Sequence, residues 1–332
     1  MSSRERTDVR LTWKMWFTAP ATAWQAYWFR PVPLMRLALV RIIFVACHLL
    51  FFFPSLQRQR MLVENNDAFI EPQVIVQVVT AIVPEHLFRT LETVTTLWAL
   101  TFAAGLFALV GLFTRTMLFA MAAGSALLVA HNFSYGTHHH PQALFTIVLF
   151  LLALAPCGAV LSVDAWWKAR RTNDEAAGTL DEQRQRLSTL AFWPLLSAQW
   201  LLAMAYFSAG VCKLYIGGLT WFNGTTMQAY LLEDAIRWNR PLGLWAAQQW
   251  ELALAMSFFA VGFELAFPLV LLFRRLVPWF VIAGLSMHMG IFVLQAAPFW
   301  QFMLLYLVFV PVERVWDWAR QPRGVMPTPT TG

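Results

Sequence analysis

The chain has 332 residues, of which 59% are hydrophobic and 13% are charged, with a formal net charge of +6. A soluble globular domain carries roughly a quarter charged residues, so this composition excludes an ordinary soluble protein and indicates a membrane protein. The positive charge does not indicate nucleic-acid binding, because the basic residues lie in short loops between apolar runs, where they set membrane orientation.

The first part of the chain is predicted to lie on the membrane rather than across it. Residues 9–30 mix Trp, Phe and Tyr with Arg and Lys, which is typical of an amphipathic helix along the interface. We therefore expect residues 1–30 to form a cytoplasmic arm with an interfacial helix, residues 31–316 to form a transmembrane domain, and residues 317–332 to form a disordered cytoplasmic tail.

Long apolar runs predict an all-α, polytopic membrane bundle of about eight spanning helices. These runs lie at residues 34–57, 91–113, 116–134, 142–161, 190–213, 247–273, 276–295 and 298–315. The run QVIVQVVTAIV at 73–83 is too short to span the membrane, and the loop at 214–246 mixes Gly, Trp and apolar residues. Both are expected to be interfacial or re-entrant segments on the outer face.

The placement of Lys and Arg predicts the orientation. With eight spans, one face receives every cluster of basic residues: the N-terminal arm, Arg115, the loop at 162–189, Arg274 with Arg275, and the segment after the last helix. The positive-inside rule assigns this face to the cytoplasm. Both termini are therefore expected in the cytoplasm, and GTHHHP (136–141) is expected on the outer side.

Ionisable residues inside spans are costly, so each one suggests a role. Arg36 is expected to reach the cytoplasmic headgroups. Arg41 lies more than a turn deeper, where a headgroup contact and an internal ion pair are both open. Glu264 is a candidate partner, because both residues fall in the cytoplasmic half of this topology. We interpret Arg41 and Glu264 as structural polar residues.

Histidines gather near the outer face. His138, His139 and His140 suggest a metal, but neighbouring residues on a helix do not share a face and no second ligand cluster accompanies them. No metal is therefore predicted, and a polar loop and an active-site histidine both remain open. His288 lies in the outer half of its span and is open to a packing or a site role. A haem held by His48 and His288 is a further alternative.

Lys213 follows the segment YFSAGVC at the outer end of the span predicted at 190–213. An amine at this depth can snorkel to water as an anchor. The small residues on either side, including Gly210, allow close backbone approach and can enclose the amine. A desolvated lysine can act as a neutral base. The residues alone leave the anchor and the base open.

Three segments carry a resemblance to a known family. The lysine motif is YFSAGVCKL (206–214), followed by Trp221 and Gly224. The second is HHHPQALFTIVLFLLALAPCGAVLSVD (138–164), with a histidine, an apolar helix and an S-x-D ending, and the third is MHMGIFVLQ (287–295). Together they resemble the vitamin K-dependent gamma-carboxylase family and the related bacterial HTTM (horizontally transferred transmembrane) domain proteins, over residues 30–316.

The resemblance implies an enzyme of the bacterial inner membrane with a site that faces the outer side. In the carboxylase, a lysine deprotonates reduced vitamin K. Oxygenation to the epoxide by O2 then yields a strong base that removes a glutamate γ-proton, and the carbanion takes up CO2. Lys213 would be the initiating base and His140 the stabilising histidine. The reduced quinone from the membrane pool, vitamin K or menaquinone, would be bound by His139 (the alternative to His140), His288, Trp221 and Tyr206.

The chain also departs from the carboxylase, which has a large lumenal domain after its membrane part. Cys212 here replaces the first of two paired lysines. Quinol epoxidation therefore carries over more directly than glutamate carboxylation, and the proton donor is open: a peptide, a protein or a small molecule. An alternative of another class is a non-catalytic membrane protein for export, immunity or maturation of a secreted factor. In either case Gly210 and Gly224 are expected to be structural.

Overall fold

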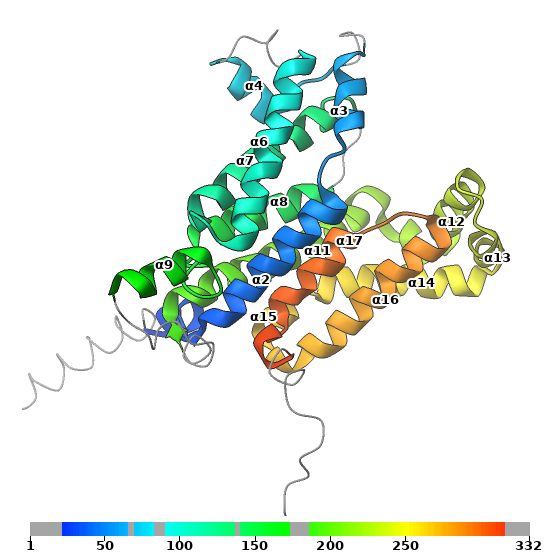
Figure 1. The fold of residues 1–332 in the computed structure, drawn as a ribbon. Helices are drawn as coiled ribbons and strands as arrows, with labels where there is room; N and C mark the ends of the chain where they lie inside the picture. The colour runs from blue at the N-terminus through cyan, green and yellow to red at the C-terminus, as the bar shows by residue number, and fades with distance from the viewer. Residues whose placement is uncertain (1–21, 66–69, 83–89, 137–139, 173–185, 316–332) are drawn as a thin grey trace, which may run out of the picture.

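The computed structural model describes residues 22–65, 70–82, 90–136, 140–172 and 186–315. Within these ranges the secondary structure is almost entirely helical (Figure 1), which confirms the predicted all-α membrane bundle. Most of the helix predicted at 9–30 and the whole tail at 317–332 lie outside the described residues. The described segments that are long and apolar enough to cross a membrane are Leu34–Phe52, Leu91–Val110, Thr114–Phe133, Thr189–Phe222 and Arg274–Gln295.

Every predicted span contains a helix of the structure. These helices are α2 (Leu34–Cys47) with the π-helical turn η1 (His48–Phe52), α6 (Leu91–Val110), α7 (Thr114–Phe133), α8 (His140–Leu154), α11 (Phe192–Gly217), α14 (Trp250–Ala266), α16 (Val277–Gln295), and α17 (Trp300–Leu305) with the 3₁₀ turn η7 (Tyr306–Phe309). Apolar runs in the sequence therefore locate the helices, and five of the described segments are long and apolar enough to span the membrane, against about eight predicted.

Prolines set helix ends that the apolar runs do not reveal. α8 ends at Leu154, two residues before Pro156. The single span predicted at 247–273 is interrupted, because α14 ends at Ala266 and the short α15 (Leu269–Leu272) follows Pro268. Proline has no N–H to donate and restricts the residue before it, so a regular helix rarely continues through it.

The helix end predicted at Lys213 is wrong. α11 runs from Phe192 to Gly217, so Lys213 lies inside the helix. The small residues and the lysine of this motif are compatible with helix, and the end of an apolar run marks a change of surroundings rather than a change of backbone. The helix stops where Gly218 takes a φ of 55°.

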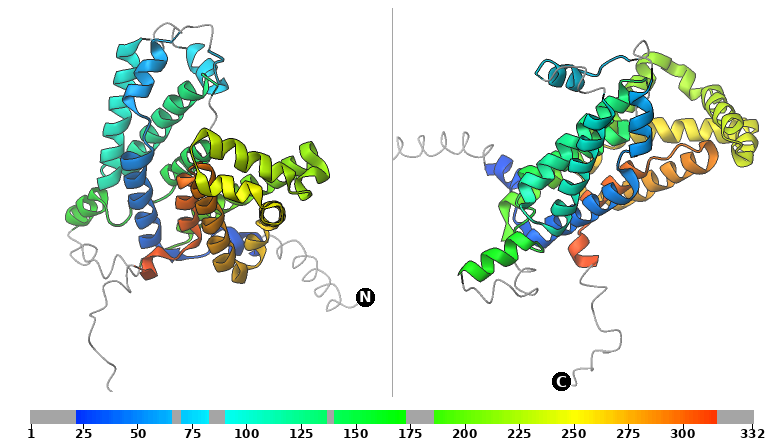
Figure 2. Two further views of the ribbon diagram at one scale, coloured as in Figure 1. Left: turned by 90° about the vertical axis from the view of Figure 1, so that its right-hand side faces the viewer. Right: turned by 45° about the horizontal axis from the view of Figure 1, so that its top comes forward.

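The spans form two packed groups (Figures 1 and 2). In one group α7 packs against both α6 and α8, and α2 packs against α6. In the other group α11 and α16 pack against α14, and α16 also contacts α17. Contacts of α8 with α11 and α17 join the two groups. A helical hairpin of α12 (Thr225–Arg237) and α13 (Pro241–Gln248) contacts α14 and α16.

One end of the bundle gathers segments that were predicted to share the basic face. The two-residue strand β1 (Val32–Pro33) pairs antiparallel with β2 (Leu187–Ser188), which ends the loop at 162–189. Arg30 lies over the ring of Phe192, with its guanidinium carbon 3.9 Å from the ring centroid. These contacts bring the N-terminal arm, this loop and the start of α11 together.

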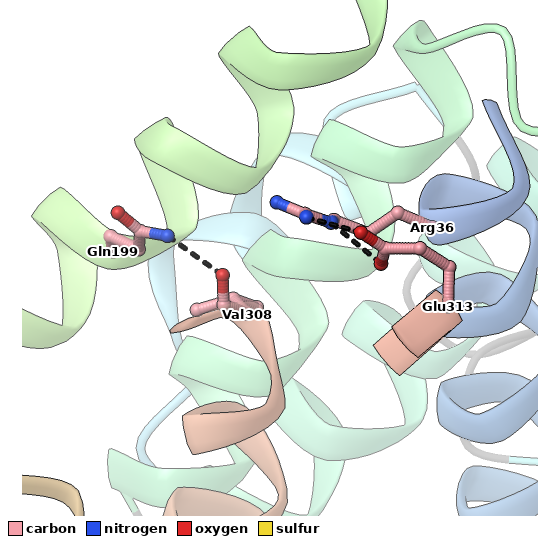
Figure 3. Close-up of polar contacts among 4 residues, drawn as sticks. All are labelled: Arg36, Gln199, Val308 and Glu313. Atoms are coloured by element: carbon pink, nitrogen blue, oxygen red, sulfur yellow. Dashed lines mark hydrogen bonds and ion pairs between the residues drawn. The ribbon is translucent and has the colours of Figure 1, made fainter. Parts of the chain in front are cut away.

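Polar contacts tie the last helix to the same end (Figure 3). Arg36 forms an ion pair with Glu313, so the headgroup contact expected for Arg36 is wrong. The Gln199 amide donates to the Val308 carbonyl at 2.7 Å, and its oxygen accepts from Arg274 at 2.7 Å. Polar groups this close to hydrocarbon need protein partners, and these partners hold α2, α11 and η7 in place.

The S-x-D segment of the second motif caps two helices. Asp164, in the first turn of α9 (Val163–Thr172), accepts from the N–H groups of Phe113 and Thr114 at 2.8 and 2.7 Å and from the Thr114 hydroxyl at 2.7 Å. The first N–H groups of a helix lack partners within it, so Asp164 caps α7. The Ser162 hydroxyl oxygen accepts from an N–H group of α9 at 2.9 Å in the same way.

Arg41 lies fully buried beside this junction. Its guanidinium donates to the backbone carbonyls of Cys157 and Leu161 at 3.1 and 2.6 Å. These carbonyls belong to the turns after α8, where intrahelical hydrogen bonds have ended. The predicted pairing of Arg41 with Glu264 is therefore wrong, because Arg41 is committed to carbonyl groups of the loop.

The opposite end carries α3 (Leu56–Val63) and α4 (Val74–Thr80) (Figure 1). Gln59 joins α3 to α7, since its amide donates to the Leu128 carbonyl at 3.1 Å and its oxygen lies 2.8 Å from Nδ1 of His131. The helix α4 lies within the short run predicted at 73–83, and several of its apolar side chains are exposed. An exposed apolar face is typical of an interfacial helix.

We expect Asp164→Ala to lower the midpoint of thermal unfolding of the detergent-solubilised protein. The change removes the hydrogen bonds that cap α7, and the loss of a helix cap costs about 1 kcal/mol. Glu233→Ala is the matched control, because Glu233 is an exposed acid in a surface pair with Arg237. Equal midpoints for the two variants would contradict the capping role.

Candidate functional site

A cavity of about 690 Å³ opens between α11, α12, α14 and α16. Its volume is within the range of about 300–1,000 Å³ that is typical of sites for small organic ligands. Much of the wall consists of alanine, methionine and phenylalanine side chains. The ionisable residues that line the cavity are His140, Tyr206, Lys213, Tyr230, Asp234, Glu264 and His288.

Lys213 reaches the cavity from the same face of α11 as Tyr206 and Ala209. These residues are three and four positions apart, and such residues lie along one side of a helix. Lys213 Nζ donates to both carboxylate oxygens of Glu264, on α14, at 2.6 and 2.7 Å. The side chains of Lys213 and Glu264 are 23% and 10% exposed, so the ion pair is largely shielded from water.

The close approach of α11 to α14 at this ion pair is favoured by Gly210. A Cβ at Gly210 would lie 3.0 Å from side-chain atoms of Leu265 and 3.2 Å from the Cβ of Glu264. Small residues let helix backbones approach closely in a membrane. Gly210 therefore gives the lysine, one turn further along α11, a carboxylate within hydrogen-bond distance.

The ion pair adds an arrangement that the sequence did not suggest for Lys213. The sequence left a snorkelling ammonium and a neutral, enclosed amine open. In the structure the lysine is enclosed and its charge is balanced by Glu264. If Glu264 takes a proton from Lys213, both groups become neutral, and the amine can then accept a proton from a ligand.

Aromatic rings enclose the amine from the side of α12. The ring centroid of Trp221, in the 3₁₀ turn η5 (Gly218–Phe222), lies 5.4 Å from Lys213 Nζ. Trp221 also stacks on Tyr230 of α12, with 5.8 Å between centroids. Between them Gly224 takes a φ of 79°, and a Cβ there would lie 3.0 Å from the indole nitrogen of Trp250. The turn therefore needs a glycine to bring α12 onto the cavity.

A buried chain of hydrogen bonds ends at His288. The hydroxyls of Tyr306 and Tyr206 lie 2.7 Å apart, and the Tyr206 hydroxyl lies 2.5 Å from Nε2 of His288. The His288 ring stacks on Phe299, with 4.9 Å between centroids. Nδ1 of His288 is buried and has no hydrogen-bond partner among the residues that the structure describes.

The direction of the hydrogen bonds from Tyr306 through Tyr206 to His288 determines the tautomer of His288. Each phenol has one proton to donate. If Tyr306 donates to Tyr206 and Tyr206 donates to Nε2, both phenol protons are satisfied, and a neutral imidazole then carries its proton on Nδ1. The reverse order leaves the buried Tyr306 proton with no acceptor in the described part of the chain. We therefore assign His288 a free Nδ1–H donor beside the cavity.

His140 begins α8 and shares an aromatic neighbour with His288. The ring centroid of His140 lies 5.6 Å from the centroids of Phe299 and Phe302. His138 and His139 lie outside the described residues, so the alternative role of His139 stays a prediction. Across the described ranges, no three His, Cys, Asp or Glu side chains are grouped closely enough to hold a metal ion.

The haem alternative does not fit the positions of its two histidines. Nε2 of His48 lies 2.9 Å from the Ser125 hydroxyl, and the His48 ring stacks on Phe145. Nε2 of His288 is engaged by Tyr206. His48 is not among the described residues that line the cavity with His288, so the two rings do not face one pocket.

The cavity brings together most of the side chains that the resemblance singled out: His140, Tyr206, Lys213, Trp221 and His288. It also includes Glu264, which the sequence analysis had paired elsewhere. The partner of a lysine on another helix cannot be found from periodicity, because periodicity describes one helix at a time. The SAG segment before Lys213 is the one local sign of a close helix contact.

Sequence reasoning missed Tyr306 and Asp234. Tyr306 lies in an apolar span, where a tyrosine has no distinguishing pattern. Asp234 lies on α12, outside the spans, and lines the cavity. Burial raises the pKa of the Asp234 carboxyl above its usual range, and the neighbouring Glu233 raises it further. The amphipathic segment LLEDAIR was a sign of a helix with one covered face, but not of a cavity.

A family model described as the HTTM domain matches residues 29–316, which is most of the chain. The matched range includes every described residue that lines the cavity. Searches of curated proteins and of solved structures found no match.

We expect Lys213→Met and Glu264→Met each to lower the thermal unfolding midpoint strongly, because each leaves one charge buried without its partner, at a cost of about 3–5 kcal/mol. The double variant removes both charges and should be more stable than the sum of the two changes implies. Thermal unfolding of all four proteins in one detergent measures this coupling. Strictly additive shifts would contradict a direct ion pair.

Proposed function

Because the chain belongs to the HTTM domain family, we propose that its cavity binds a reduced quinone and that the protein is a membrane enzyme that oxygenates it. The HTTM domain is found in the gamma-carboxylase family. The observation that supports the proposal most is the lysine–carboxylate pair at an apolar cavity that also holds two histidines. Such a site combines a base with walls suited to a lipid-soluble ring.

The residues fit a reduced naphthoquinone. Its fused rings need apolar and aromatic walls, which Met256, Phe259 and Phe299 provide. Its oxygens need polar partners, which are available at the Lys213 pair and at the unpartnered Nδ1 of His288. When bound, the reduced ring would supply, with O2, the epoxide and the strong base on which carboxylase chemistry depends.

Lys213 and Glu264 would start the reaction by moving protons in two balanced steps. Glu264 takes a proton from the Lys213 ammonium, which leaves a neutral amine and a neutral carboxyl group. The amine then takes the proton of a ligand hydroxyl and becomes an ammonium beside the oxyanion that remains. The shielding of the pair from water strengthens this attraction.

The histidines would orient the ligand at the other side of the cavity. His288, held by Tyr206, donates its Nδ1–H to a ligand oxygen. Tyr306 acts through Tyr206 and is therefore a positioning residue. His140 contacts the same phenylalanine as His288 and lies close enough to the cavity to stabilise developing charge.

In the second half of the proposed reaction, the strong base removes a proton from a second substrate. Glutamate carboxylation by CO2 is the carboxylase-like case. This second substrate, a peptide, protein or small molecule, would approach from the end of the bundle that carries α12. We place the protein in the bacterial cytoplasmic membrane, with the basic end in the cytoplasm and the cavity towards the outer side. The apolar spans and the gathered basic segments support this orientation.

We expect purified protein in lipid nanodiscs to convert reduced menaquinone or vitamin K to its epoxide under oxygen, measured by mass spectrometry of the extracted quinones. Lys213→Ala should lower the rate by about 100-fold or more, because a positioned general base contributes at least that much. Cys212→Ala is the matched control, since Cys212 adjoins the lysine but is exposed and does not line the cavity. Absence of epoxide with the wild-type protein would sink the proposal.

Tyr306→Phe should raise the KM for the quinol roughly fivefold, because one neutral hydrogen bond that orients His288 is lost, at about 1 kcal/mol. Tyr135→Phe is the matched control: its hydroxyl donates to the Leu62 carbonyl at 2.5 Å, at the α3 end of the bundle. Steady-state kinetics and thermal midpoints of both variants separate positioning from stability. A KM unchanged by Tyr306→Phe would contradict the positioning role.

A further inference from the structure

A second hollow, of about 380 Å³, lies at the surface of the protein between α14 and α16. We call it the α14–α16 groove. It is formed by aromatic and small residues, without ionisable side chains among the residues that line it. Its main lining residues are Phe259, Gly262 and Phe263 of α14 and Trp279, Phe280 and Ala283 of α16.

The groove is continuous with the cavity. Phe259 lines both hollows. On α16, Ala283 lines the groove, and Met287 and Gly290 line the cavity four and seven positions further on. Residues at this spacing lie along one face of a helix. The lining of the two hollows therefore runs along one face of α16, from Trp279 to Ile291, over about 18 Å. On α14 the two hollows lie on neighbouring faces that meet at Phe259.

Small residues keep this path open. A Cβ placed on Gly262 or on Gly290 would meet no atom within 4 Å. The rings of Phe263 and Phe280 stack with 5.5 Å between centroids and form the floor of the groove. Because both glycines lie in helix interiors, where glycine is less favourable than alanine by about 1 kcal/mol, their presence is better explained by the space they leave than by helix stability.

The polar and apolar parts of this path are separated along α16 and lie on neighbouring faces of α14. The ionisable groups line the cavity, which α12 covers. On α16 the groove lies towards the start of the helix, near Val277, whereas on α14 it lies beside the stretch that carries Glu264. A ligand that fills both hollows has a polar ring at one end and a hydrocarbon chain at the other. In the orientation proposed above, the hydrocarbon chain then runs within the bilayer from the cavity towards its cytoplasmic side.

We propose that the α14–α16 groove binds the isoprenoid tail of the quinone whose ring lies in the cavity, and that the ligand enters from the lipid between α14 and α16. This inference rests on the proposed function, since the occupant of the groove is the tail of the cavity's ligand. The continuity of the two hollows through Phe259 is what distinguishes the groove from an ordinary lipid-facing surface.

The test compares the reduced forms, kept without oxygen, of two quinones with the same ring: menadione, which has no tail, and menaquinone with a short isoprenoid tail. Binding to the full chain in detergent is measured by quenching of tryptophan fluorescence. The ligand concentration is expressed per mole of detergent, so that partitioning of the quinone into the micelles is the same for all proteins. Gly262→Leu fills the groove and should weaken menaquinone binding about tenfold, which equals the loss of about two buried methylene groups. Its affinity for menadione should be unchanged.

Gly290→Leu is the matched control, because it adds the same side chain to open space in the cavity rather than the groove. It should weaken both quinones. Ala283→Leu fills the groove from its other wall and should repeat the effect of Gly262→Leu, so that the test stands if one variant folds poorly. Thermal midpoints report whether each variant folds.

The possible outcomes separate the two proposals. If the wild-type protein binds menadione but Gly262→Leu and Ala283→Leu leave menaquinone affinity unchanged, the groove holds annular lipid or a second copy of the chain, and the tail site is overturned. Equal weakening of both quinones by Gly262→Leu also overturns it. If the wild-type protein binds neither quinone, the proposed quinone function itself fails.

Discussion

The ion pair of Lys213 with Glu264 is the interaction on which the rest of the site depends. In an apolar environment either charge alone would be costly, so α11 and α14 must remain close enough for both hydrogen bonds. That closeness is favoured by Gly210, where a Cβ would crowd the side chains of Leu265 and Glu264. Once the two helices are held together at this level, the space beside them, bounded by α12 and α16, becomes a cavity with a charged pair in its wall.

The two ends of the bundle are organised differently, and this difference gives the cavity its direction. At the basic end, side-chain contacts such as Arg36 with Glu313 and Gln199 with Val308 join helices directly. Arg41 binds the carbonyls of a loop there. At the other end, α12 and α13 lie across α14 and α16 and enclose space rather than fill it. Polar partners thus close one end, and a helical hairpin covers the other.

The sequence predicted the fold better than it predicted the site. Each predicted apolar run contains a helix, because burial in hydrocarbon requires apolar helices, and five of the described segments are long enough to span the membrane. The apolar runs did not locate helix ends such as those at Ala266 and Gly217, which depend on single prolines and glycines. The resemblance supplied Lys213, Tyr206 and His288, but neither Glu264 as the partner of Lys213 nor Tyr306 as the partner of Tyr206. Such partners lie on other helices, and their choice is made by tertiary packing, which leaves no periodic trace in a single sequence.

The position of Tyr206 and Lys213 on one helix limits how this protein can evolve. They are seven residues apart on the same face of α11, and each engages a different neighbour: His288 in one case and Glu264 in the other. One inserted or deleted residue between them would turn one side chain about 100° relative to the other. Substitutions that leave the small residues Ala209 and Gly210 in place can therefore accumulate in the intervening FSAGVC, whereas its length cannot change. Descendants that keep both contacts must inherit this segment as a unit of fixed length.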